Sequence, residues 1–172
     1  IWLVGAGIML GKLCIRYFRF NRYVKRKAKS PAEEIKQKFH HQKTKLQIQK
    51  NIELKMLAEI SSPALIASLK PTVLMPETIE ANALEFGILH ELTHYKRKDY
   101  LMVLLLHILS CMHWFNPVVW IAKKCILADM ELVCDAQVAA HLTKKERRTY
   151  AQTLIGLPVD GNYKKLAVGM RG

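Results

Sequence analysis

The sequence predicts a mainly helical domain with a small β-hairpin or sheet, attached to a membrane helix. Three observations support this fold class. An uncharged run, residues 1–10, is followed at once by aromatic and basic side chains. Two short apolar runs, residues 64–69 and 72–75, are bounded by prolines and are typical of strands. Most of the remaining chain is divided by helix-start signals into segments of helical length.

The first twenty residues, 1–20, are expected to be the end of a transmembrane helix. The uncharged run gives way to Lys and Arg interleaved with Tyr17, Phe18 and Phe20, a composition typical of a membrane–water interface. The run is shorter than the roughly 20 residues that span a bilayer, so we expect this helix to start before residue 1. The alternative is an amphipathic helix lying on the protein itself.

Positive charge is concentrated between Lys12 and Lys50, where thirteen Lys and Arg stand against two acids. Such a segment can face nucleic acid, a membrane surface or solvent. Because an apolar run precedes it, lipid headgroups are the expected neighbours, and no direct contact with nucleic acid is expected. The positive-inside rule places the chain that follows in the cytoplasm. Residues 21–60 are therefore interpreted as a basic juxtamembrane helical region.

Two helix starts are predicted from capping patterns. Ser30 as N-cap, with Pro31 at the first helical position and an acid at the third, predicts a polar helix that runs to about Ile60 in one or two pieces. Asn82, with a glutamate three residues later, predicts a second helix that runs to about Lys98.

The uncharged stretch of residues 101–122 is long enough to resemble a second membrane span. It is broken by Asn116-Pro117, which indicates a turn and the start of a long helix to about His141. We therefore expect a buried core helix followed by a turn, with shallow membrane contact left open.

The last predicted helix begins at Thr143, which forms a capping pattern with Glu146, and it runs to about Leu157. The remainder, residues 158–172, contains several glycines and is interpreted as a flexible linker toward a following membrane helix.

The segment His90-Glu91-Leu92-Thr93-His94 is an H-E-x-x-H motif inside the second predicted helix. Two histidines four residues apart lie on one helix face, about 5–6 Å apart at Cβ, and can bind one metal ion. Glu91 is offset by one residue, where a carboxylate can accept a proton from a metal-activated water. The plainer interpretation is a helix with two unrelated histidines and a solvated acid.

A catalytic zinc ion needs three protein ligands and one open position, so a third ligand is expected elsewhere. On the long helix, Glu131 and Asp135 are four residues apart and share a face. If Glu131 binds the metal, Asp135 can accept the free N–H of a ligand imidazole and fix its tautomer. An ordinary solvated acid pair is the alternative.

The chain resembles the BlaR/MecR antibiotic sensor-transducer metallopeptidases from Ile1 to about Leu157. The motifs that carry the resemblance, in the family's order, are His90–His94 followed by Lys96–Asp99, then His113–Pro117, then Glu131–Asp135.

This resemblance implies a zinc endopeptidase. By position in the motifs, His90, His94 and Glu131 would be the zinc ligands and Glu91 the catalytic base. Asp135 would hold a ligand imidazole from outside the metal's own ligand shell.

The resemblance also implies an architecture and partners. Residues 61–157 would be the metallopeptidase core, with a zincin-like fold of the gluzincin type, on the cytoplasmic side of a multi-pass cell-membrane protein. A β-lactam-binding sensor domain elsewhere in the full-length protein would activate it. The substrate would be a DNA-binding transcriptional repressor. Apart from the resemblance, we expect the enzyme to cut its own tail, residues 158–172, because a protease needs an extended, locally unfolded substrate. A homodimer is left open.

Two other functions remain open from the sequence alone. One is a membrane-tethered, non-catalytic adaptor with a structural metal site. The other is a housekeeping membrane metalloprotease with a different trigger.

Several further residues receive weaker predictions. Asp99 is expected to be at least a helix N-cap. The cysteines are interpreted as small buried apolar residues, of which only Cys134 lies next to the proposed site. Candidates for stabilising the oxyanion are Tyr150, Arg147 and Arg148.

Overall fold

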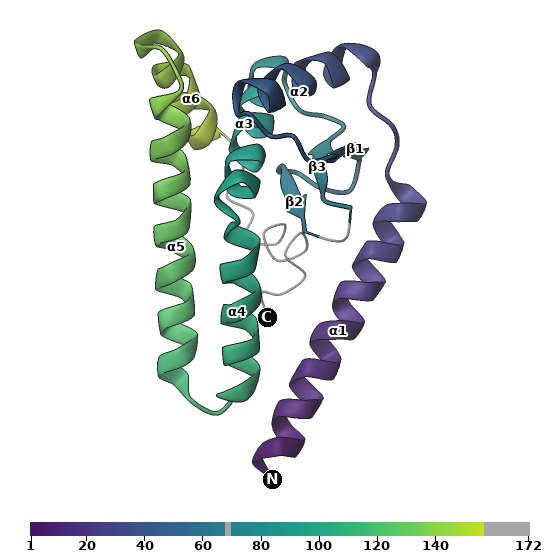
Figure 1. The fold of residues 1–172 in the computed structure, drawn as a ribbon, viewed down its shortest axis with the longest axis vertical. Coiled ribbons are helices and arrows are strands. Elements are labelled where there is room, and N and C mark those ends of the chain that lie inside the picture. Colours follow the sequence, from purple (N-terminus) through teal and green to yellow (C-terminus); the bar gives the residue numbers. More distant parts are fainter. Residues whose placement is uncertain (68–69, 157–172) are drawn as a thin grey trace.

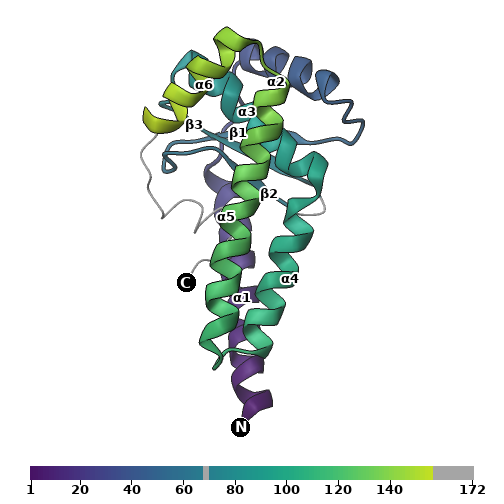
Figure 2. The same ribbon diagram turned by 90° about the vertical axis from the view of Figure 1, so that its left-hand side faces the viewer.

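The computed structural model describes residues 1–67 and 70–156. Its elements are α1 (Trp2–Lys27), α2 (Glu33–Lys45), β1 (Glu53–Leu57), β2 (Ala64–Ile66), β3 (Thr72–Pro76), α3 (Ala81–Arg97), α4 (Asp99–Met112), α5 (Pro117–Ala140) and α6 (Lys144–Gly156). The sheet with α2, α3 and α6 forms the upper part, called the head below (Figure 1). Helix α1, helix α4 and the first half of α5 (residues 117–128) extend downward as a stalk (Figure 2). The predicted mainly helical class with a small sheet is confirmed.

The sheet has the strand order β1-β3-β2, with β1 parallel and β2 antiparallel to the central strand β3. All five residues of β3 are buried. The two strands predicted around Pro71 are therefore confirmed, and they pair directly, with Leu65 opposite Val73. Such short strands gain their stability from long-range packing on both faces.

Strand β1 contradicts the prediction of helix up to Ile60. Helix α2 already ends at Lys45, and its N-cap is Ala32 rather than Ser30. The local composition favours helix, but Leu54 and its neighbours pair with β3, which lies almost twenty residues further along the chain. Tertiary pairing overrides local propensity here.

The other helix boundaries are closer to the predictions. Helix α3 begins at Ala81, so Asn82 lies inside the helix rather than at its cap. The Asn116 side chain accepts a hydrogen bond from the Val118 N–H at 3.0 Å and caps α5 as expected. Glu146 accepts hydrogen bonds from both the N–H and the hydroxyl of Thr143, which confirms the last capping pattern.

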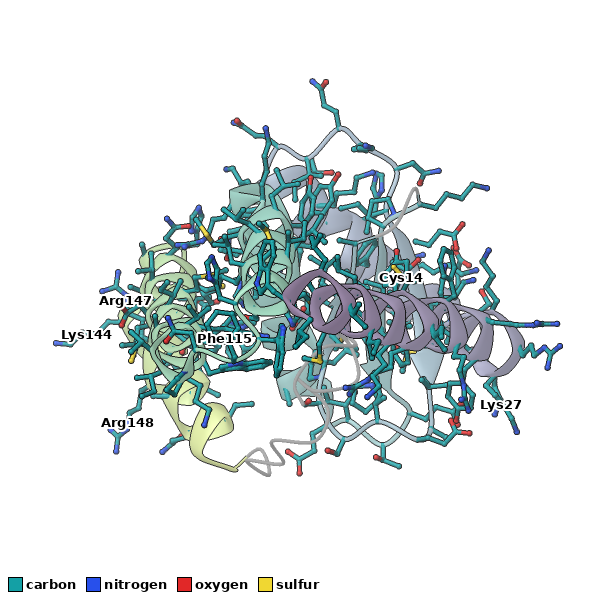
Figure 3. The ribbon with its side chains drawn as sticks, turned by 90° about the horizontal axis from the view of Figure 1, so that it is seen from below. Cys14, Lys27, Phe115, Lys144, Arg147 and Arg148 are labelled. Atoms are coloured by element: carbon teal, nitrogen blue, oxygen red, sulfur yellow. The ribbon has the colours of Figure 1, made fainter. Side chains whose placement is uncertain are left out.

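The prediction of a buried helix in residues 101–122 is wrong. Helix α4 packs against α1, α5 and the end of α3, but its outer face is open, and Leu101 and Leu105 are about half exposed at 51% and 49%. Cys14 and Cys125, expected to be buried, are exposed as well; Cys14 is visible from below in Figure 3.

Among the residues that the structure describes, no helix is both long enough and apolar enough to cross a bilayer.

The main hydrophobic core lies between the sheet and the helices of the head. Ile88, Leu89 and Leu92 on α3 are essentially inaccessible to solvent. They pack in one cluster with β3 and with Cys134 and Val138 of α5. Burying each large apolar side chain contributes about 1.5–3 kcal/mol. This packing fixes the rotation of α3 and therefore the direction of its polar face.

Candidate metal centre

Helix α3 brings the two histidines of the H-E-x-x-H motif together. The His90 and His94 rings lie edge to face, with centroids 4.6 Å apart. Their Nε2 atoms approach to 3.0 Å. Both side chains are largely buried, with 13% exposed.

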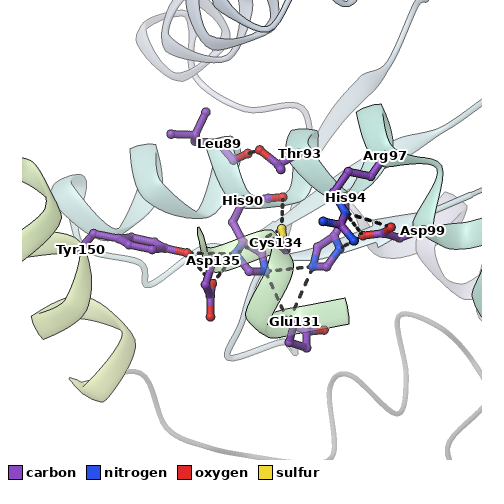
Figure 4. A network of polar contacts seen from close by, with 10 residues as sticks. All are labelled: Leu89, His90, Thr93, His94, Arg97, Asp99, Glu131, Cys134, Asp135 and Tyr150. Carbon is purple, nitrogen blue, oxygen red and sulfur yellow. Dashed lines mark hydrogen bonds and ion pairs between the residues drawn. The ribbon is translucent and has the colours of Figure 1, made fainter. Parts of the chain in front are cut away.

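Helix α5 adds the carboxylate of Glu131 to this pair (Figure 4). Its Oε2 lies 3.6 Å from His90 Nε2 and 3.7 Å from His94 Nε2. Zinc bound tetrahedrally at about 2.0–2.2 Å would hold its ligand atoms roughly 3.3–3.5 Å apart. The three atoms therefore already have nearly the spacing of one tetrahedral metal site.

The far side of each imidazole is held by another carboxylate. Asp99 Oδ2 lies 2.7 Å from His94 Nδ1, and Asp135 Oδ1 lies 3.1 Å from His90 Nδ1. When each Nδ1 donates its proton to a carboxylate, each Nε2 keeps its lone pair for the metal side. Two lone pairs and the Glu131 carboxylate then converge and repel one another, and a cation among them removes this repulsion. The donor set therefore fits a divalent metal.

The position of Asp99 depends on the junction between α3 and α4. Lys98 links the two helices with a left-handed backbone, φ 60° and ψ 31°, and is itself the N-cap residue of α4. The expectation that Asp99 is the N-cap is therefore wrong. The turn directs the buried Asp99 back toward His94, where Arg97 Nε also donates to it at 3.0 Å. The sequence alone does not assign this role to Asp99, because a non-glycine left-handed residue such as Lys98 carries no clear local signal.

Tyr150 reaches the centre from α6. Its hydroxyl donates to Asp135 Oδ1 at 2.7 Å and lies 3.1 Å from His90 Nδ1. Of the three residues considered for the oxyanion, it is the one found at the site. Arg147 Nε bonds the Leu142 carbonyl instead, and Arg148 points outward from α6 (Figure 3).

Glu91 is 8% exposed and lies on the turn of α3 that carries His90. With Asp99, Glu131 and Asp135 it makes four carboxylates around two imidazoles. Burial alone would lower the pKa of His94, but its hydrogen bond to Asp99 and the other negative groups raise it to about 12. Burial likewise opposes protonation of His90, yet the carboxylates of Asp135 and Glu131 raise its pKa well above the ordinary value. This excess of negative charge favours a bound cation.

Cys134 is fully buried behind the histidines. Its Sγ lies 3.6 Å from the His90 carbonyl oxygen, and it can be grouped with His90 and His94 within a 4.8 Å cluster of ligand atoms. Burial raises the pKa of the thiol, but the two histidines outweigh this and lower it. Of the other histidines, His40, His41, His113 and His141 are exposed, whereas His107 is buried in α4.

An H-E-x-x-H helix, an acid supplied by a second helix and outer carboxylates on both imidazoles together define a metallopeptidase-type centre. The comparison with known proteins gives the particular class. Residues 1–171 match the family model described as BlaR1 peptidase M56, and the chain belongs to that family.

The curated relatives are named as regulatory or methicillin resistance proteins. The chain is 28% identical to the regulatory protein BlaR1 of Bacillus licheniformis over 158 residues, covering 90% of the chain and 26% of the relative. It is 29% identical to the regulatory protein BlaR1 of Staphylococcus aureus, with 90% and 27% covered. It is 30% identical to the methicillin resistance mecR1 protein of Staphylococcus epidermidis over 110 residues, with 62% and 19% covered. The chain spans about a quarter of the length of the BlaR1 relatives.

Proposed function

We propose that this chain is the catalytic unit of a membrane-attached zinc endopeptidase in an antibiotic-sensing signal transducer. The observation that carries the proposal is the convergence of His90 Nε2, His94 Nε2 and Glu131 Oε2 within 3.0–3.7 Å of one another. Membership of the BlaR1 peptidase family supports the reaction class.

In the proposed reaction, His90, His94 and Glu131 hold the metal. A zinc ion bound there would supply a water acidified to a pKa of about 7 and would polarise a peptide carbonyl. Glu91 accepts the proton of the attacking water and later returns it to the leaving amine. Asp135 and Asp99 keep the two imidazoles in the tautomer whose Nε2 faces the metal.

The proposed substrate is a cytoplasmic DNA-binding repressor, whose cleavage would induce β-lactam resistance. The names of the curated relatives, regulatory protein BlaR1 and methicillin resistance mecR1 protein, support this choice. A β-lactam-binding sensor domain, elsewhere in a longer protein, would supply the signal. The enzyme would also cut itself in residues 158–172, which lie outside the described residues.

We also propose that residues 1–20 attach the chain to the cell membrane and that the head faces the cytoplasm. The exposed apolar residues at the start of α1 and the basic residues that follow them support this topology. The boundaries at residues 20, 60 and 157 and the gluzincin type of the fold remain predictions of the same proposal, which leaves the oligomeric state open.

One pair of variants tests the catalytic proposal. Glu91→Gln should keep zinc, because this residue is not a ligand, and should reduce peptide cleavage at least about 100-fold. Glu131→Gln should lose zinc affinity, because a neutral amide is a poor substitute for a carboxylate ligand. Metal content by atomic spectroscopy and cleavage of a purified repressor separate the two effects. Full turnover by Glu91→Gln would remove the proposed base.

The second candidate function is an adaptor with a structural metal site. Cys134 favours it, because the thiol lies in one ligand cluster with His90 and His94 and would help to close the site. Under this alternative, Cys134→Ser should release zinc and Glu131→Gln should not. The catalytic proposal predicts the reverse.

A further inference from the structure

The lower part of the stalk exposes many large apolar side chains. Figure 3 looks at it from below, with Phe115 at the turn between α4 and α5. The side chains exposed there are Ile1, Trp2, Leu3, Val4, Ile8, Leu104, Leu105, Ile108, Leu109, Met112, Trp114, Phe115, Val118 and Ile121. A contiguous apolar surface of this kind marks contact with another macromolecule or a membrane.

The start of α1 packs against the turn of the α4–α5 hairpin. Trp2 Nε1 donates to the Met112 carbonyl oxygen at 2.7 Å. Gly5 lies against the Trp114 ring so closely that a Cβ there would come within 2.5 Å of its Nε1. Residues more than one hundred positions apart therefore meet at the lower end of the stalk.

Several polar groups in this region are paired within the stalk. Trp120 Nε1 donates to the Trp114 carbonyl oxygen at 3.1 Å, and the Ser110 hydroxyl donates to the Leu106 carbonyl oxygen. With the Trp2 bond and the Asn116 cap described above, these contacts use donors and acceptors that water would otherwise serve. Internal pairing of this kind is what a lipid environment requires.

Charged residues end the apolar zone on α1 and on α5. The first charge on α1 is Lys12, and on α5 the first charges are Lys123 and Lys124. Lys12 and Lys124 are exposed, and the buried Lys123 lies 5.3 Å from the Trp120 ring centroid. At about 1.5 Å per residue, the uncharged segments of α1, α4 and α5 are roughly 10–20 Å long. This matches one leaflet of a hydrocarbon core that is about 30 Å thick.

The topology of the hairpin fixes how it can enter a bilayer. Helices α4 and α5 are antiparallel and joined by residues 113–116, and both lead back into the head. We propose that the α4–α5 hairpin is a re-entrant wedge that inserts beside α1 into one leaflet of an anionic bilayer, with Lys12 and Lys124 at the headgroups. This extends the membrane attachment proposed for α1 to a second element, and it does not depend on catalysis.

The native tryptophans allow a direct test. The chain has three, Trp2, Trp114 and Trp120, all in this region, and Trp2→Phe leaves only the two of the hairpin. The variant is reconstituted in vesicles of phosphatidylglycerol and phosphatidylcholine that carry brominated acyl chains. We expect its emission to fall at least twofold when bromine lies within the acyl chain, and quenching by aqueous iodide to be lost.

Two outcomes would overturn the proposal. Vesicle-bound protein with unquenched tryptophans would mean that α1 alone attaches the chain. Tryptophan emission that is not quenched by bromolipid, but changes with protein concentration, would mean that a second copy of the chain covers this surface. Either result leaves the catalytic proposal intact, because that proposal is measured by cleavage.

A matched pair of variants tests the hairpin turn itself. Phe115 is 59% exposed. In the same Trp2→Phe background, Phe115→Glu should reduce bromolipid quenching several-fold, whereas Phe115→Leu should keep it. Unchanged zinc binding and circular dichroism show that Phe115→Glu is folded. A folded Phe115→Glu variant that is quenched like Phe115→Leu would contradict insertion of the turn.

Discussion

Helices α3 and α4 follow each other directly in the chain. Their sequences suggest that the more apolar α4 is the more buried of the two, but the structure shows the reverse. Helix α3 carries charged residues and the two histidines, yet Ile88, Leu89 and Leu92 on its inner face are completely buried. Helix α4 is almost entirely apolar, yet much of its surface is open. Apolar composition therefore does not identify the core of this chain. Burial depends on whether a helix has partners on several sides, and α3 has the sheet, α2, α5 and α6.

The first prediction tests this comparison by making the same substitution, leucine to alanine, in both helices. Leu89→Ala on α3, where the side chain is 1% exposed, should lower the free energy of unfolding by about 2–5 kcal/mol. Leu105→Ala on α4, at 49% exposed, should lower it by less than about 1 kcal/mol. Urea unfolding followed by circular dichroism in mild detergent measures both. Equal losses would show that α4 is as closely packed as α3.

The second prediction concerns the junction between the two helices. Asp99→Asn removes the carboxylate that holds His94 Nδ1 at 2.7 Å. Loss of such an outer carboxylate typically weakens metal binding about 10–100-fold. Competition with a fluorescent zinc chelator measures the change. Glu53→Gln, an exchange on β1 away from the centre, serves as the control and should bind zinc normally. An unchanged affinity in Asp99→Asn would mean that His94 is oriented by packing alone.

Sequence reasoning predicted the parts of the centre that lie on single helices. The spacing of His90 and His94, and that of Glu131 and Asp135, follows from helical periodicity, and the structure brings all four together. Their roles as ligands and outer partner stay predictions. Asp99 and Tyr150 could not be assigned in the same way, since they reach the histidines only through the left-handed turn at Lys98 and the packing of α6.

The same limit explains the errors in the fold. Strand β1 was predicted as helix because its neighbours are rich in Lys and Gln, and its pairing with β3 has no local signal. Helix α4 was predicted as core because hydrophobicity reports a preference to leave water and not the identity of the partner. In both cases the missing information was the long-range neighbour.

The third and smallest effect is expected at Tyr150. Its hydroxyl lies between Asp135 Oδ1 and His90 Nδ1 at 2.7 and 3.1 Å, so it steadies the outer side of the centre rather than the metal side. Tyr150→Phe removes one hydrogen bond, worth about 0.5–1.5 kcal/mol, and zinc affinity should fall roughly two- to tenfold by the same energy. A matched Tyr95→Phe variant, on α3 but with its ring stacked on Tyr100, should bind zinc like the wild type. If Tyr150→Phe instead abolished cleavage while zinc affinity stayed normal, the hydroxyl would act on the reacting carbonyl, and Tyr150 would belong to the catalytic residues.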